Sequence, residues 1–238
     1  MKTEKGFTLV EVLIIAPVLM LTIIILMNFL FNQFGQLTQQ GALINLQTEA
    51  QSISFSMQDD IFFAAAFNTN MNSNLQDPYQ PSGGWQHSTT PQTLIVSTPA
   101  LTANRRSADR QTVYIDTAGC DPSVIEENAV LLNNVIYFTS GTTLYKRIVS
   151  APDTMATCGT SYVKQSCPAA NSNSSCPPDR VVTNNLNSIA YTYYDANNNE
   201  VSNPLIATKV KIDLELKDRA FAEDIFATSS ITLKRLNQ

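Results

Sequence analysis

The chain has 238 residues, which is enough for one medium-sized domain with a membrane anchor or for two small domains. Its formal net charge is −5, so it lacks the basic surplus typical of nucleic-acid-binding proteins. Charged residues make up 15% of the chain, below the usual share in soluble proteins. These values argue against a nucleic-acid partner and favour an exported surface protein over a cytosolic enzyme.

The N-terminus carries a membrane-spanning signal. Lys2 and Lys5 precede an apolar run at residues 7–31. About 20 apolar residues suffice to cross the hydrocarbon core as a helix, and positive charge before the run keeps that end cytoplasmic. A secretory signal peptide is the alternative, but it would have a shorter apolar core followed by a small-residue cleavage site. Here the run leads into Asn32 and Gln33, so an anchoring helix is predicted.

Two residues are unusual for a plain anchor. Glu11 lies inside the apolar run, where an ionisable side chain is costly and is by default a functional hypothesis. The alternative is a tolerated polar residue whose carboxylate snorkels to the membrane interface. Pro17 lies in the middle of the run, where its missing N–H and its clash with the carbonyl of Leu13 predict a kink or a local opening.

The string GFTLVE at residues 6–11, behind a short basic leader and ahead of the apolar run, resembles the type IV prepilin family. The resemblance implies that a membrane-embedded prepilin peptidase cuts after Gly6 on the cytoplasmic side, so that residues 1–6 are a cleaved leader. It also implies that the same enzyme methylates the new amino terminus of Phe7. Many members of the family place a proline near the end of the membrane run, whereas here the proline comes earlier, at Pro17.

A physical reason can be given for each part of this processing. Gly6 lets an extended backbone enter the protease site without a side chain in the way. Cleavage there leaves the apolar helix attached to the mature chain. The new amine of Phe7 is a cation in apolar surroundings, and Glu11 of a neighbouring subunit can neutralise it, so that two costly charges become one pair during assembly.

Residues 32–66 are predicted to continue the helix with one apolar face. With the anchor this gives about 60 residues, or about 90 Å at 1.5 Å per residue. Its second half is expected to lie against a globular head, and an isolated amphipathic stalk is the alternative. The apolar positions recur at three- and four-residue steps, namely Leu43, Leu46, Ala50, Ile53, Met57 and Ile61.

The remainder, residues 67–238, is predicted to be an extracytoplasmic, β-rich head. Long loops are expected at 67–92, where Trp85 and His87 are interpreted as surface or loop-anchoring residues, and at 150–180. Alternating patterns predict short strands that form an antiparallel sheet on the helix, so the fold class is α+β. The predicted strands are 93–97, 112–116, 134–139, 143–149, 188–194, 208–217 and 229–236.

The four cysteines favour two disulfides, because three of them lie in a loop with little local structure to hold it. A zinc site is the alternative, but it would need closely spaced cysteine pairs or histidines, and His87 is the only histidine. The pairing cannot be derived from the sequence, and neither a metal nor another cofactor is predicted. The candidates are Cys120, Cys158, Cys167 and Cys176.

Two charged clusters have a functional and a structural interpretation. The basic cluster Arg105, Arg106 and Arg110 is interpreted as a solvated loop, with an anion site as the alternative. Residues 195–200 carry oxygen ligands at alternate positions, as calcium loops do, but they lack the glycine and glutamate of such loops. A hairpin turn explains this segment more simply.

The functional prediction is a filament subunit and not an enzyme, because no catalytic triad, phosphate loop or metal cluster is evident. The expected partners are other pilin subunits, the prepilin peptidase, the inner-membrane assembly platform and the membrane. The chain is expected to be a single-pass membrane protein that later joins an extracellular filament. Residues 46–61, with Asp59 and Asp60, resemble W-type minor pilins and J-type pseudopilins. One alternative is a type II secretion pseudopilin, which shares the leader. The other is a tip adhesin or uptake receptor with the same anchor, which the long loops at 67–92 and 150–180 motivate.

Overall fold

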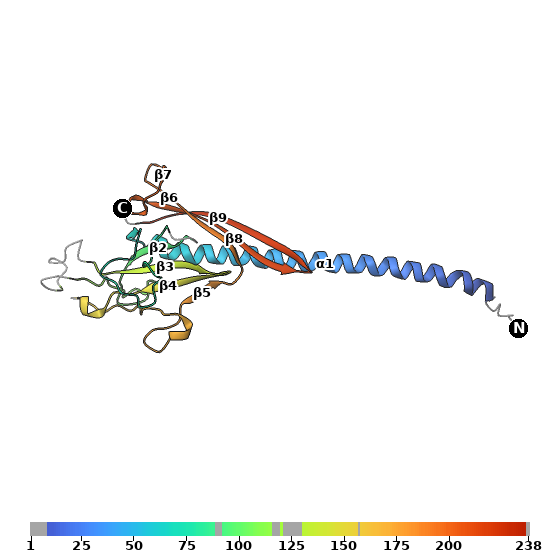
Figure 1. Cartoon of the computed structure of the whole chain (residues 1–238), viewed down its shortest axis with the longest axis horizontal. Coiled ribbons are helices and arrows are strands. Elements are labelled where there is room, and N and C mark those ends of the chain that lie inside the picture. Colours follow the sequence, from blue (N-terminus) through green and yellow to red (C-terminus); the bar gives the residue numbers. More distant parts are fainter. Residues whose placement is uncertain (1–8, 89–91, 116–119, 121–129, 157, 237–238) are drawn as a thin grey trace.

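One long helix projects from a β-rich head that is built around its C-terminal half (Figure 1). The structure is a computed structural model that describes residues 9–88, 92–115, 120, 130–156 and 158–236. The helix packs against antiparallel sheets, which confirms the predicted α+β architecture. The overall shape is pilin-like.

The helix α1 (Leu9–Phe62) has 54 residues, which corresponds to about 80 Å at 1.5 Å per residue. It contains Pro17 and continues on both sides of it, and the kink expected there stays a prediction. Near Phe62 the helix gives way to a turn, and the backbone N–H of Leu236 donates to the Phe62 carbonyl over 3.0 Å. That bond satisfies one of the carbonyls that every helix end leaves without an intrahelical partner. The predicted apolar face is confirmed, since it is buried at Leu46, Ala50, Ile53, Met57 and Ile61 and partly buried at Leu43.

The first sheet is antiparallel with the strand order β1-β2-β3-β4-β5. The sequence Ser140-Gly141-Thr142 predicts a hairpin turn between two strands, and Gly141 at φ 60° opens the turn between β3 and β4. Two 3-10 helices follow β4, η2 (Asp153–Met155) and η3 (Ala169–Asn171). The strands are β1 (Ala66–Phe67), β2 (Leu94–Pro99), β3 (Leu132–Ser140), β4 (Thr143–Val149) and β5 (Arg180–Thr183).

The strand predicted at 112–116 is not formed in the described part of that segment, which ends at residue 115. Thr112 makes one isolated bridge with Leu101, and Tyr114 makes isolated bridges with Val130 and Cys158. Val113 is fully buried and packs in an apolar cluster with Ile95 of β2 and Ile136 of β3. The alternating residues therefore belong to a loop that buries the side chain of Val113, and the prediction of a strand was wrong.

The second sheet is antiparallel with the order β7-β6-β8-β9. Its strands are β6 (Leu186–Tyr194), β7 (Glu200–Val201), β8 (Lys209–Ala220) and β9 (Glu223–Lys234), and η4 (Pro204–Ile206) precedes β8. β8 and β9 pair along their full length, from Lys209 with Lys234 to Ala220 with Glu223. They are longer than predicted because the connecting turn is only Phe221-Ala222, both at positive φ. Such turns favour Asn and Gly, so the sequence gives no turn signal here.

The main core lies where α1 passes between the two sheets (Figure 1). Its buried residues come from the C-terminal half of α1, from β2, β3 and β4 on one side, and from β6, β8 and β9 on the other. A second apolar cluster, which includes Trp85, Ile95 and Ile136, covers the outer face of the first sheet beneath the loops. The N-terminal half of α1 thus extends beyond the head.

Candidate assembly rod and the head that carries it

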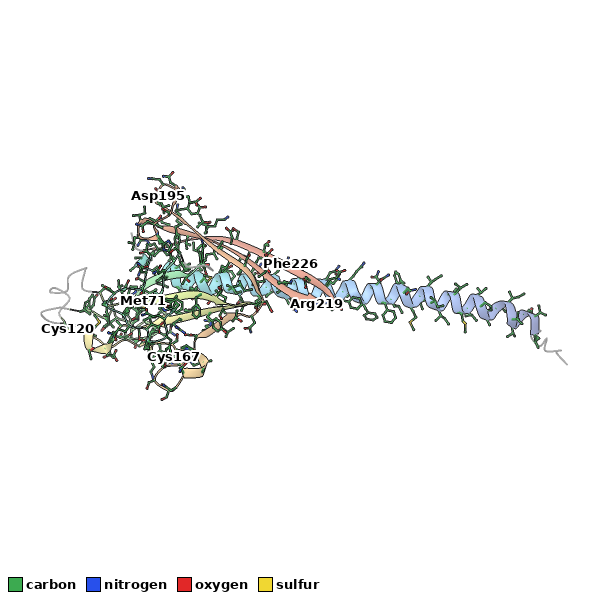
Figure 2. The ribbon with its side chains drawn as sticks, in the orientation of Figure 1. Met71, Cys120, Cys167, Asp195, Arg219 and Phe226 are labelled. Atoms are coloured by element: carbon green, nitrogen blue, oxygen red, sulfur yellow. A yellow bond between two sulfur atoms is a disulfide. The ribbon has the colours of Figure 1, made fainter. Side chains whose placement is uncertain are left out.

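The N-terminal half of α1 is an apolar rod, which we define as residues 9–34. Every large apolar side chain from Leu9 to Phe34 is exposed, and side chains protrude along the whole length of the rod (Figure 2). The rod is long and apolar enough to cross a membrane. At 1.5 Å per residue it spans about 39 Å, whereas the hydrocarbon core of a bilayer is about 30 Å thick.

The hydroxyl group of the one threonine in the rod makes a hydrogen bond within the helix. Thr22 Oγ1 donates to the carbonyl of Leu19 over 2.8 Å. Just beyond the rod, Thr38 Oγ1 donates to the carbonyl of Phe34 over 2.8 Å. Bonds of this kind reduce the cost of placing a hydroxyl group in an apolar medium. Within the described rod, Glu11 is the residue with an ionisable side chain.

The residues of the predicted processing site lie outside the described part of the chain. Gly6 and Phe7 precede Leu9, where the description of α1 begins. Glu11 lies in the first described turn of α1 and is exposed on the helix surface. The structure therefore places Glu11 at the far end of the rod from the head. Its role in assembly, the cleavage and the methylation stay predictions.

Two disulfides close loops of the head. Cys120 pairs with Cys158 across 38 positions of sequence, with a Cα–Cα distance of 5.4 Å. Cys167 pairs with Cys176 nine positions further on, with a Cα–Cα distance of 5.7 Å. The predicted disulfides are thus present, and the structure supplies the pairing. Bonds of this kind form and persist outside the reducing cytosol.

A buried ionic cluster joins both long loops to the first sheet. Arg147 on β4 has a side chain that is 3% exposed, and its Nη1 donates to Asp77 Oδ2 over 3.0 Å. Its Nε donates to Asp179 Oδ1 over 3.0 Å. Asp77 belongs to the loop at 67–92 and Asp179 to the loop at 150–180, so one guanidinium holds both. We refer to these three residues as the Arg147 cluster.

Aromatic rings and a tryptophan N–H complete the Arg147 cluster. The guanidinium lies over the ring of Trp85, 5.3 Å from its centroid, and Trp85 Nε1 donates to Asp77 Oδ2 over 2.7 Å. Burial lowers the pKa of Arg147, but the hydrogen bond and charge of Asp179, and then Asp77, outweigh it and leave a net rise. Trp85 therefore anchors its loop, which is one of the two roles expected for it.

Sequence reasoning missed this cluster. Its one local signal is that Arg147 shares a strand face with Val149, which is buried. A cation in phase with a buried apolar residue indicates a buried charge, and such a charge needs partners. The partners Asp77 and Asp179 lie far away in the sequence and in loops, where nothing distinguishes them from solvated carboxylates.

The basic cluster at 105–110 is not simply solvated, which corrects the interpretation given above. Arg105 Nη1 pairs with Asp60 Oδ1 over 2.9 Å, and Arg106 Nη2 pairs with Asp59 Oδ2 over 2.9 Å. Arg110 donates to the Ser107 carbonyl of its own exposed loop. The side chain of Asp60 is 5% exposed, so Arg105 neutralises a buried carboxylate.

Asp60 has two further partners on the first sheet. Its Oδ2 accepts from Tyr137 Oη over 2.6 Å and pairs with Lys146 Nζ over 2.5 Å. Burial, and then the Asp60 carboxylate, raise the pKa of Tyr137 well above its usual range. The acidic end of α1 is therefore a structural junction between the helix and the sheet.

A cavity of about 440 Å³ opens at this junction. Apolar walls come from Phe63, Leu101 and Ile148, and Tyr162 adds an aromatic ring. The charged residues in its lining are four cations and two carboxylates, so the cavity suits an anionic ligand within a chain of net negative charge. They are Arg105, Arg106, Lys146, Arg180, Asp59 and Asp60.

The segment at 195–200 forms the predicted hairpin turn between β6 and β7. Asp195 Oδ1 accepts the backbone N–H groups of Asn197 and Asn199, each over 2.8 Å. The hydrogen bonds from Asn199 are the main reason that the pKa of Asp195 is lowered. Asn198 at φ 66° completes the turn. In the described part of the chain, no group of three or more His, Cys, Asp or Glu residues could hold a metal ion.

The comparisons with known proteins do not assign the chain to a family. No protein-family profile matches it, and no curated protein sequence matches it. The shape of the fold and the short string at residues 6–11 are therefore the grounds on which a function can be proposed.

Proposed function

We propose that the chain is a subunit of a type IV pilus or a related filament. In this proposal the prepilin peptidase removes residues 1–6 and methylates the amino terminus of Phe7. Before assembly the chain is a single-pass membrane protein. The inner-membrane assembly platform then extracts it, and the apolar rods of successive subunits pack together in an extracellular filament. Its size favours a minor subunit, and a secretion pseudopilin is the variant that shares the same leader.

The observation that carries the proposal is that the apolar rod is exposed along its whole length. Burying one Val, Leu, Ile or Phe side chain contributes about 1.5–3 kcal/mol. Exposing every large apolar side chain of residues 9–34 to water would therefore cost tens of kcal/mol. A bilayer before assembly and neighbouring rods after assembly both remove this cost. A cleaved signal peptide would not explain why the rod is continuous with the core helix of the head.

The proposal is tested by shearing surface filaments from intact cells and quantifying the chain by mass spectrometry. We expect it in the sheared fraction at low abundance relative to a major subunit. Deleting the prepilin peptidase should shift it entirely to the membrane fraction. Recovery of the chain in the cytosol, or its absence from sheared material of piliated cells, would contradict the proposal.

Recognition of an anionic ligand is a second candidate function, favoured by the cavity at the end of α1. Intact filaments passed over heparin-coated beads, as a polyanion probe, should be retained. Charge reversal at the cavity, Arg106→Glu with Arg180→Glu, should abolish retention. The matched control, Arg110→Glu with Lys164→Glu, makes the same charge change outside the lining and should retain binding. Equal retention of both double variants would rule out the cavity as the site.

A further inference from the structure

The tip of the β8–β9 hairpin is held against α1 at the point where the apolar rod ends. We define the hairpin tip as residues 219–224. Gly35 is buried there, and a Cβ atom added to it would lie 2.9 Å from Cε1 of Phe221. One turn further along, Gln39 Nε2 donates to Glu223 Oε2 over 2.8 Å. The absence of a side chain at Gly35 therefore lets the phenyl ring contact the helix.

Phe221 is a costly choice of residue for this turn. Its φ is 50°, a left-handed conformation that L residues other than Asn and Gly adopt with strain. Its ring contacts Gly35, yet the residue remains 58% exposed. Packing on the helix therefore uses only part of the ring. Phe34, which precedes Gly35 in the sequence, is itself 63% exposed.

The hairpin tip lies at the level of a membrane surface if the rod crosses a bilayer. The rod spans about 39 Å, whereas the hydrocarbon core is about 30 Å thick and the headgroup regions bring the whole bilayer to about 40–45 Å. The last apolar residues of the rod then lie in the outer headgroup region. Gly35 follows Phe34 directly, so Phe221 shares that depth.

Resting on the proposed membrane insertion, we propose that the hairpin tip binds the headgroup region of the phospholipid bilayer that α1 crosses. Phe221 inserts its exposed edge among the lipids next to the rod, and Arg219 reaches the lipid phosphates. Figure 2 shows Arg219 at the end of the hairpin beside the helix, and Phe226 farther back toward the head. The contact fixes the depth and the orientation of the subunit before assembly.

A phospholipid fits this surface better than a protein partner does. The partly exposed phenyl of Phe221 contacts Gly35, the residue that directly follows the rod, so the same medium can cover both. Behind the ring, Lys217 Nζ pairs with Asp224 Oδ2 over 2.7 Å. Residues 217–224 carry two cations and three carboxylates, a net charge of −1, so they offer no strong charge to an oppositely charged protein surface. An aromatic ring near a cation suits a membrane interface.

The test uses the full chain reconstituted in phosphatidylcholine–phosphatidylglycerol vesicles that carry bromine near the glycerol end of the acyl chains. Bromine quenches indole emission at short range. Phe221→Trp should show strong quenching, whereas Phe226→Trp, farther along the same hairpin, should show much less. The unmodified chain supplies the background, because its single tryptophan, Trp85, is buried in the head.

Extraction at alkaline pH separates this inference from the proposed function. If the chain resists extraction but the indoles introduced at positions 221 and 226 are quenched equally weakly, the lipid contact is wrong and membrane insertion stands. If the chain is extracted, insertion itself fails. A blue shift of the indole at position 221 that occurs only on filament assembly would assign the tip to a neighbouring subunit and overturn the lipid contact.

Discussion

Replacing Glu11 by Gln is expected to reduce incorporation of this subunit into filaments strongly while leaving cleavage after Gly6 intact. In the proposed filament core, the Glu11 carboxylate neutralises the amine of Phe7 on a neighbouring subunit. Removing one partner of a buried charge pair costs about 2–5 kcal/mol. Each 1.4 kcal/mol is a factor of ten in an equilibrium constant, so incorporation should fall by about thirtyfold or more. The measurement is quantitative immunoblotting of sheared filaments.

The matched control for this variant is Glu49→Gln on the same helix. Glu49 lies in the head, where its Oε2 accepts from Asn185 Nδ2 over 3.0 Å. Glutamine keeps an oxygen acceptor there, so the control should assemble like the unmodified chain. The size of both variants on gels reports cleavage independently of assembly. Normal filament incorporation of the Glu11→Gln variant would remove the role assigned to this carboxylate.

Replacing Arg147 by Met is expected to destabilise the head more than any surface substitution. The change leaves the carboxylates of Asp77 and Asp179 buried without their cation. Breaking a buried ion pair in this way costs about 3–5 kcal/mol. At about 2–4 °C per kcal/mol for a domain of this size, the melting temperature should fall by roughly 6–20 °C. Circular dichroism of the detergent-solubilised chain measures the change.

Two further variants show whether uncompensated charge causes that loss. Arg106→Met breaks an exposed pair, because Arg106 and Asp59 have side chains 85% and 59% exposed. Exposed pairs contribute about 0–1 kcal/mol, so its melting temperature should barely change. Adding Asp77→Asn and Asp179→Asn to Arg147→Met should recover part of the loss. No recovery would show that packing of the Arg147 side chain, and not its charge, holds the loops.

Local patterns in the sequence predicted the parts of the fold that depend on neighbouring residues. The three- and four-residue spacing from Leu46 to Ile61 placed the buried face of α1 correctly, because helix geometry alone aligns those side chains. Gly141 marked its turn because glycine is the residue that most readily adopts positive φ. Alternation in 208–217 identified β8 except for its last three residues, and the face of β8 toward the core buries Val210, Ile212 and Leu214.

Features that depend on contacts across the fold could not be predicted. The turn at Phe221-Ala222 contains no residue that favours positive φ, and contact with Gly35 on α1 is visible only after folding. The Arg147 cluster joins a strand to two loops that are distant in sequence. From the sequence, Gly35 is expected only to weaken the helix. In the structure its missing side chain makes room for the ring of Phe221. The processing residues Gly6 and Phe7 remain a sequence prediction.

The most direct test of the filament account is the mass of the N-terminal peptide of the chain recovered from cells. The account predicts a mature chain that begins at Phe7 with one methyl group on its amine and that keeps the whole apolar rod. A chain that still begins at Met1, or that has lost residues 7–31, would contradict it.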